Sequence, residues 1–135
     1  MDNIGLIVNR DKDKEFKYAS ILAESFSKRG IKVLAASDVS AGTGLRENGF
    51  DDDYVINNSD MLICMGGDGS FLRLARKVYD RNVPILGINL GSLGFLTEVD
   101  KNDIDNAAEC IAAGNYVIED RMVLEAVIKR GSKTI

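Results

Sequence analysis

The chain alternates short apolar runs with polar segments of helical spacing, and this alternation limits its fold more than any other feature. Apolar runs of strand length occur four times, at residues 4–8, 31–35, 60–65 and 84–88. Segments with an apolar residue every three or four positions lie at residues 11–29, 70–79 and 104–112. Strands that alternate with helices pair in parallel, and the helices pack on both faces of the sheet. The sequence therefore predicts an α/β fold with an open, mostly parallel sheet and helices on both faces.

Capping residues support the limits of these helices. Gly30 and Gly114 are expected to end the first and third helices, and Asn102 or Asp103 is expected to begin the third. Residues 37–59 show no clear period, and we expect a long, mobile loop there with one helical turn around residues 43–48. The acidic run Asp51-Asp52-Asp53 is interpreted as a solvated part of this loop, with metal binding as the alternative.

The last part of the chain breaks the alternation. Residues 122–130 are typical of a long strand, and no helical segment follows it. A strand without a partner is an aggregation hazard. We therefore expect the chain to be cut from a longer protein, with an α/β domain at residues 1–119 and the start of a β-rich second domain at residues 120–135.

Composition excludes several classes of function. The 135 residues suit one domain, and the net charge of −4 argues against a nucleic-acid or membrane-surface role. No apolar stretch approaches the ~20 residues of a membrane span, and the N-terminus does not resemble a signal peptide. The absence of histidine excludes a histidine-based triad and the common zinc sites. Cys64 and Cys110 are expected to be reduced core residues, which favours a cytoplasmic location.

Two glycine-rich turns are the candidate ligand site. Gly66-Gly67-Asp68-Gly69-Ser70 follows the third apolar run, and a second turn from Asn89 to Gly94 follows the fourth. Ligands of parallel sheets bind beyond the carboxyl ends of the strands, so the two turns should form two walls of one crevice. Helix-start amides favour a phosphate there. A phosphate site does not need a second anion, so Asp68 requires another explanation.

The common nucleotide fingerprints are absent. Val8-Asn9-Arg10 stands after the first strand where a Rossmann dinucleotide site has its glycines, and no phosphate loop ending in Gly-Lys-Ser or Gly-Lys-Thr occurs. Phosphoryl chemistry in this chain must therefore use a different design.

Taken together, the two motifs resemble the NAD kinase family. Gly66-Gly67-Asp68-Gly69 is followed at the family's interval by Asn89-Leu90-Gly91-Ser92-Leu93-Gly94-Phe95-Leu96-Thr97-Glu98, and the likeness extends over residues 4–130. The resemblance implies the Rossmann-like N-terminal domain of an enzyme that transfers a phosphoryl group from ATP, or in some members polyphosphate, to the adenosine-ribose 2′-hydroxyl of NAD.

The resemblance also implies roles for individual residues. Asp68 matches the family's proton acceptor, and Gly69 the neighbouring position against which NAD lies. Arg73 matches an NAD-binding position of many bacterial members, and Phe95 and Leu96 match a pair near the adenine. The expected nucleotide-binding set is Gly66, Gly67, Asp68, Gly69, Arg73, Asn89, Gly91, Phe95 and Leu96.

The family chemistry explains the carboxylate. A carboxylate within hydrogen-bond reach can orient an alcohol and accept its proton, whereas phosphoryl transfer otherwise depends on positioning and on cations. A divalent ion, Mg²⁺, is therefore implied; the sequence shows no carboxylate cage, so ATP phosphates and water would supply its ligands. The family's Asn-Glu or Asn-Asp pair, which grips the nicotinamide nucleotide's ribose, does not follow residue 130.

Several expectations follow from the missing pair, and alternatives remain. We expect the chain to be inactive alone, and the longer enzyme to be a homodimer or homotetramer without nucleic-acid or membrane partners. A lipid kinase of the diacylglycerol or sphingosine type shares only the first motif, and a non-enzymatic nucleotide-binding domain is the other rival. Asp68 as a helix cap, Arg73 as a solvated helix residue and Phe95 as a core aromatic are the purely structural alternatives.

Overall fold

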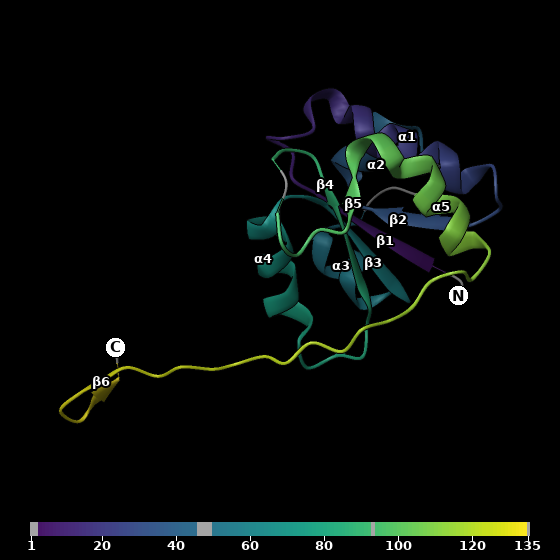
Figure 1. Ribbon diagram of the computed structural model, residues 1–135. Coiled ribbons are helices and arrows are strands. Elements are labelled where there is room, and N and C mark those ends of the chain that lie inside the picture. Colours follow the sequence, from purple (N-terminus) through teal and green to yellow (C-terminus); the bar gives the residue numbers. More distant parts are fainter. Residues whose placement is uncertain (1–2, 46–49, 93, 135) are drawn as a thin grey trace.

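A five-stranded parallel sheet forms the centre of the computed structural model, which describes residues 3–45, 50–92 and 94–134 (Figure 1). The strand order is β2-β1-β3-β4-β5. The strands are β1 Asn3–Val8, β2 Lys32–Ala35, β3 Met61–Gly66, β4 Ile85–Asn89 and β5 Val99–Asp100. The predicted α/β class and all four predicted strands are confirmed. Strand β5 is only two residues long and was not predicted.

Helices cover both faces of the sheet (Figure 1). One face carries α1 Lys17–Ser27, α2 Ser37–Thr43 and α5 Ile104–Ala112, and the other carries α3 Asp52–Asn57 and α4 Asp68–Val78. Two short 3-10 turns, η1 Lys14–Phe16 and η2 Lys101–Asp103, precede α1 and α5. None of the helices in the described ranges is long and apolar enough to cross a membrane.

The core consists of two apolar layers, one on each side of the sheet. Strand side chains alternate between them: Ile63 packs with the α1 and α5 layer, while Leu62 and Cys64 pack with Leu74 of α4. Burial raises the pKa of the Cys64 thiol to about 11, which keeps it protonated and inert at neutral pH. Both cysteines are free thiols, and Cys110 is half-buried.

Helix α1 begins later than predicted. Glu15 and Phe16 have positive φ angles of 57° and 53°, which a right-handed α-helix does not contain, so α1 begins only at Lys17. The buried Asp13 compensates, because its carboxylate accepts hydrogen bonds from the amides of Tyr18 and Ala19 at 2.9 and 2.8 Å. Gly30 and Gly114, the predicted helix ends, both have positive φ.

The expectation of a long loop at residues 37–59 is wrong. The segment contains α2 and α3, two helices too short to show a clear apolar period. Asp51 caps α3, since its carboxylate accepts the amide hydrogen of Tyr54 at 2.8 Å. The acidic run therefore begins a helix. Part of the helical turn predicted around residues 43–48 lies outside the described residues.

The strand predicted at residues 122–130 is also largely absent. Within the described part of the chain, residues 115–128 have no secondary structure. Tyr116 and Ile118 still line a cavity with Ile85 of β4, and only the later residues extend away from the body (Figure 1). Only β6 Lys129–Arg130 pairs, antiparallel with β7 Lys133–Thr134. A strand needs a hydrogen-bonding neighbour, and the apolar side chains of this tail, such as Met122 at 86 % exposure, have no surface to cover.

Replacement of Leu22 tests the α1 layer. Leu22 is buried, so Leu22→Ala should lower the free energy of unfolding by about 2–5 kcal/mol through lost burial and a cavity. The neighbouring Ile21 is 41 % exposed, and Ile21→Ala should change it by about 0.5 kcal/mol or less. Urea unfolding of both variants measures the difference, and equal losses would contradict this description of the core.

Candidate functional site

The two glycine turns leave the sheet side by side. Gly66 at the end of β3 and Asn89 at the end of β4 are directly paired in the register of the two strands. The amide of Leu90 donates to the carbonyl of Gly66 at 2.8 Å, which extends the pairing into the second turn. The expectation that both turns lie on the same edge of the sheet is therefore confirmed.

The carboxylate of Asp68 joins the two turns. Asp68 is the first residue of α4, and its side chain is directed toward the second turn. Oδ2 accepts a hydrogen bond from the amide of Phe95 at 2.8 Å, and Oδ1 accepts one from the amide of Leu96 at 3.0 Å. The structure therefore does not support the helix-cap alternative, since the carboxylate bonds residues 27 and 28 positions away.

The same amides lower the pKa of Asp68. Hydrogen bonds from the Phe95 amide, then the Leu96 amide, with a smaller contribution from Thr97, lower the pKa of Asp68 below its ordinary value. The carboxylate is thus ionised at neutral pH. Each of its oxygens has a second lone-pair direction, so this half-exposed group can still accept a hydrogen bond from a ligand hydroxyl.

Asn89 shapes the second turn. Its side chain is 4 % exposed; Oδ1 accepts the amide hydrogen of Gly91 at 2.8 Å and Nδ2 donates to the carbonyl of Ser92 at 2.6 Å. Both polar atoms are engaged within the turn. Asn89 was predicted to bind the nucleotide, whereas in the structure its side chain holds the backbone of the turn in place.

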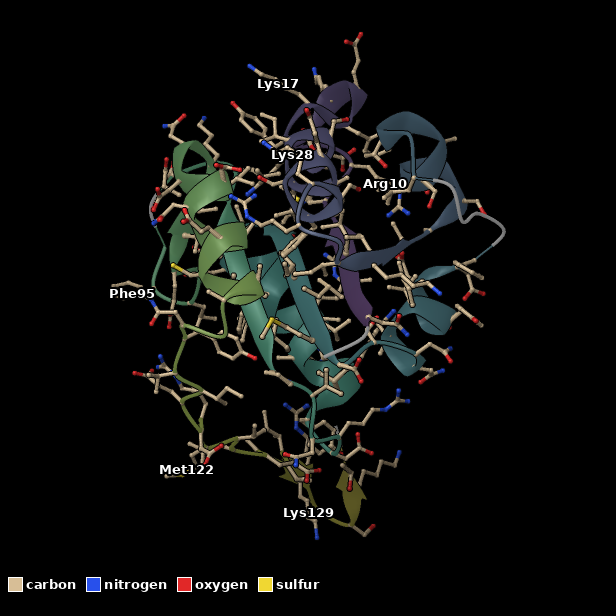
Figure 2. All side chains as sticks on the ribbon, turned by 90° about the vertical axis from the view of Figure 1, so that its right-hand side faces the viewer. Arg10, Lys17, Lys28, Phe95, Met122 and Lys129 are labelled. Atoms are coloured by element: carbon tan, nitrogen blue, oxygen red, sulfur yellow. The ribbon has the colours of Figure 1, made fainter. Side chains whose placement is uncertain are left out.

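Phe95 is exposed, with 98 % of its surface open to solvent, and it points away from the body in Figure 2. The core-aromatic alternative is therefore wrong. Its backbone is held by Asp68 while its ring has no cover from the described residues. An aromatic ring on a fixed backbone is suited to stacking against a planar ligand. Leu96, the next residue, is half-buried.

Some glycines of the two turns make room for a neighbouring side chain, whereas Gly69 borders open space. A Cβ on Gly94 would lie 2.3 Å from Oδ1 of Asp68, and one on Gly66 would lie 2.6 Å from Oγ of Ser70. A Cβ on Gly69 would meet nothing within 4 Å. A methyl group at either of the first two positions would therefore displace the side chain of Asp68 or Ser70. At position 69 glycine costs α4 about 1 kcal/mol relative to alanine, which is reasonable if a ligand must come close to the backbone there.

Arg73 faces a different cavity. It lines a cavity of about 300 Å³ together with Arg10, Asp52 and Lys77, and Asp68 is not among the residues around it. The cavity lies where β1 and β3 end, which is the point at which the strand order changes direction. The structure therefore does not bring Arg73 to the Asp68 carboxylate.

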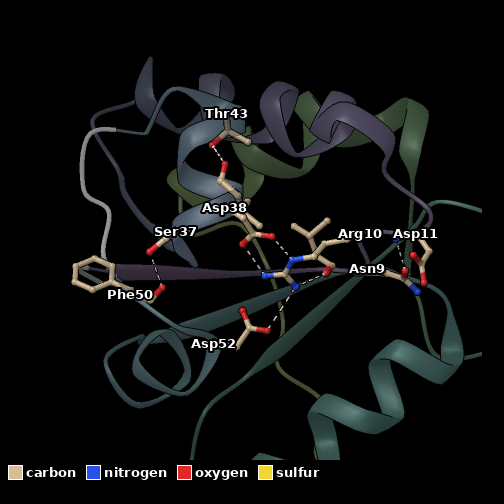
Figure 3. A network of polar contacts seen from close by, with 10 residues as sticks. Asn9, Arg10, Asp11, Ser37, Asp38, Thr43, Phe50 and Asp52 are labelled. Carbon is tan, nitrogen blue, oxygen red and sulfur yellow. Dashed lines mark hydrogen bonds and ion pairs between the residues drawn. The ribbon is translucent and has the colours of Figure 1, made fainter.

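Arg10, which also lines that cavity, lies at the centre of a polar network (Figure 3). Its guanidinium bonds Asp38 of α2, with Nη2 to Oδ1 at 2.9 Å, and lies 3.7 Å from Asp52 of α3. The hydrogen bond to Asp38 raises the pKa of Arg10, and the same bond lowers the pKa of Asp38. Asp53 pairs with Lys77 at 3.8 Å. The acidic run is therefore partly neutralised by basic side chains, so it is not simply a solvated loop.

The loop after β1 adds two residues, Asn9 and Lys12, that were not predicted for the site. Nδ2 of Asn9 donates to Oγ of Ser70 at 3.0 Å, which joins this loop to the first turn of α4. The ammonium of Lys12 lies between the glycine turns: it is 2.9 Å from the Cβ position of Gly67 and 3.7 Å from that of Gly91. Both residues follow a predicted strand, so the strand-end rule used for the glycine turns also applied to them.

No dedicated metal site accompanies these residues. In residues 3–45, 50–92 and 94–134, no three carboxylate, thiol or imidazole side chains gather closely enough to hold an ion.

The fold and the joined turns define a class of protein: an α/β domain with a candidate ligand site at the carboxyl ends of β3 and β4. The family model of the ATP-NAD kinase N-terminal domain matches residues 4–116. The chain therefore belongs to the NAD kinase family, which separates it from the lipid kinases that share only the first motif.

Individual relatives agree with this family. The chain is 42 % identical over 135 residues to an NAD kinase of Acetivibrio thermocellus and 46 % identical over 138 residues to one of Ruminiclostridium cellulolyticum. All of the chain is covered in both cases, but it spans only 47 % of each relative's length. A crystal structure of yeast NADH kinase complexed with NADH is similar in fold, with a TM-score of 0.61 and 17 % identity over 85 % of this chain and 39 % of that one.

Two alanine substitutions separate structural from functional glycines. Gly94→Ala places a methyl group against Asp68 and should lower the free energy of unfolding by about 1–3 kcal/mol. Gly69→Ala should leave it unchanged or raise it by up to about 1 kcal/mol, because alanine favours the helix. Urea unfolding measures both, and a destabilised Gly69→Ala would show that position 69 is required by the fold.

The Asp68 bonds should make stability depend on pH. The pKa of Asp68 is lower in the folded state than the ordinary value of about 3.9. The stabilisation from its ionised form is therefore complete above that value and is lost as the pH falls through the lowered folded-state pKa. At pH 7 the free energy of unfolding should be larger for wild type than for Asp68→Asn. The difference between the two should become smaller at pH values below about 3.9. Unfolding by urea across this range, with the exposed Asp80→Asn as the control, checks the sign.

Proposed function

We propose that the chain is the N-terminal domain of an NAD kinase and supplies one wall of its active site. The observation that carries the proposal is the Asp68 carboxylate, which joins the two family motifs and remains half-exposed between them. Membership of the NAD kinase family supplies the reaction: phosphoryl transfer from ATP to the adenosine-ribose 2′-hydroxyl of NAD.

Asp68 would act on the acceptor. Its ionised carboxylate accepts the hydrogen bond of the 2′-hydroxyl and takes the proton as the oxygen forms its bond to the terminal phosphorus of ATP. The bond from that phosphorus to the bridging oxygen breaks, so ADP leaves and NADP is formed. Because two amides already bond the carboxylate, its oxygens are held in one orientation throughout.

The neighbouring residues would receive the dinucleotide. Gly69 leaves open space beside Asp68, and the exposed ring of Phe95 and the half-buried Leu96 offer an apolar surface to the adenine. Gly67 and Gly91 would let the backbone of both turns approach the ligand, while Gly66 makes room for Ser70. Arg73 would contact a part of the nucleotide that extends toward the β1–β3 cavity.

A divalent ion, Mg²⁺, would enter with ATP. The described residues hold no cluster of three ligands for it, so the donor phosphates and water would provide its coordination, and it would neutralise phosphate charge during transfer.

The rest of the site would come from a second, β-rich domain that begins at residue 120. The chain spans 47 % of its relatives' length, and the tail exposes apolar side chains including Val117, Met122 and Leu124. We propose that this domain covers them, completes the ribose site and assembles the enzyme as a homodimer or homotetramer in the cytoplasm. The 135-residue chain alone would then be inactive.

A chimera tests the activity. Residues 1–135 are joined to the remainder of the Acetivibrio thermocellus relative after its matching segment, and NADP formation from NAD and ATP is assayed. Wild type should be active, and Asp68→Asn should lower kcat by about 10²–10⁴ because a general base is lost. Asp80→Asn, beyond the other end of α4, should have little effect.

Two outcomes would contradict the proposal. A wild-type chimera that folds and binds NAD without forming NADP would overturn the kinase assignment. Near-normal kcat in Asp68→Asn would exclude the carboxylate as the base. Calorimetric titration of the 135-residue chain with NAD checks the half-site separately, since tight binding would show that one wall is sufficient.

A further inference from the structure

The two glycine turns contain no positively charged side chain that could neutralise a bound phosphate. The segments 66–70 and 89–96 contain Asp68 but neither lysine nor arginine. A nucleotide polyphosphate placed there would add several negative charges beside a carboxylate whose lowered pKa keeps it ionised. Like charges in one site repel strongly unless a cation lies between them.

Lys12 brings a cation to this place. Its Nζ is 2.9 Å from the Cβ position of Gly67 and 3.7 Å from that of Gly91, so it touches both turns where neither has a side chain. No carboxylate of the described residues lies within 4 Å of this ammonium, whereas the nearby Arg10 is bonded to Asp38. Lys12 therefore keeps its charge available for a ligand.

The loop that carries Lys12 is anchored to the site. The amide of Lys12 donates to the carbonyl of Asn9 at 3.1 Å, and the amide of Asn9 donates to the carbonyl of Met65 at 2.8 Å. Asn9 also bonds Ser70 of α4. The end of β1 thus holds Lys12 against the turn that follows β3, and little backbone reordering is needed when a ligand binds.

The two sides of the joined turns differ in character. Asp68 faces the segment with Phe95 and Leu96, which presents an exposed aromatic ring. Lys12 lies at Gly67 and Gly91, on backbone with no apolar side chain. The first side suits a nucleoside and its hydroxyl, and the second suits a phosphate chain. A triphosphate carries more charge than the diphosphate of NAD and gains more from the lysine.

We infer that Lys12 binds the phosphates of the phosphoryl donor and holds them beside the hydroxyl that Asp68 faces. This inference rests on the proposed function and adds a donor-binding residue to it. Lysine suits this role as a compact point charge with three donors on a flexible stem.

Titration with inorganic tripolyphosphate tests the inference without requiring activity. Lys12→Gln should weaken binding to the 135-residue chain by about tenfold or more, the loss expected from one charge-assisted hydrogen bond. Lys12→Arg should retain most of the affinity. Lys14→Gln is the matched control, because Lys14 is also exposed and lies two residues away in η1. Equal affinity in Lys12→Gln and wild type, or equal loss in both glutamine variants, would overturn the inference.

Kinetics of the chimera then identify which substrate Lys12 serves. Lys12→Gln should raise the KM for ATP by about tenfold, with the KM for NAD and the melting temperature unchanged. A raised KM for NAD with an unchanged KM for ATP would assign Lys12 to the acceptor and refute a donor role. If the wild-type chimera makes no NADP while tripolyphosphate binding still depends on Lys12, the kinase proposal fails and the polyphosphate site remains.

Discussion

The pairing of β3 with β4 is the interaction on which the rest of the structure depends. All six residues of β3 are buried, and the strand pairs in parallel with β1 on one side and β4 on the other. A slip of one residue would turn the side chains of each face toward the opposite layer, so this register is strongly specified. It places Gly66 opposite Asn89. The two glycine turns therefore start level with each other, and Asp68 can reach the amides of Phe95 and Leu96.

This arrangement imposes a compromise on Asp68. The amides that orient the carboxylate also lower its pKa, and a weaker base accepts a proton less readily. In the proposed reaction the site would gain a fixed position for the acceptor hydroxyl, which phosphoryl transfer needs more than strong basicity. The loss of Asp68 would break the bonds between the turns and, in the proposed reaction, would also remove the proton acceptor. A comparison of NAD affinity with kcat in the same variant separates these two roles.

Helices and strands were predicted correctly where their apolar pattern extends over enough residues to be recognised. The four apolar runs became strands because burial on both faces of a parallel sheet requires a nearly continuous apolar sequence. Helices α2 and α3, with seven and six residues, are too short for an apolar period, although Asp51 carried a capping signal. The strand expected at residues 122–130 failed for another reason, because a single sequence segment does not show whether a pairing partner is present.

The location of the candidate site could be predicted from the sequence, but the arrangement of its side chains could not. Strand ends in a parallel sheet located both glycine turns, and the same rule applied to Lys12 and Asn9 after β1. The separation of Arg73 from Asp68 depends on their five-residue spacing around α4, which turns their side chains to different sides of the helix. The backbone position of Phe95 depends on the hydrogen bond that its amide donates to Asp68, 27 positions earlier, and no local pattern indicates this bond.

Exposed apolar side chains in this structure are of two physical kinds. Phe95 is 98 % exposed, but its amide is bonded to Asp68 and its position is defined before any ligand arrives. Leu124 is 85 % exposed in a tail that has neither secondary structure nor a neighbouring strand. The ring of Phe95 would lose little conformational entropy on binding a planar group, whereas the tail must order its backbone when it is covered. Phe95 is thus suited to a small ligand, and the tail to the large apolar surface of a protein domain.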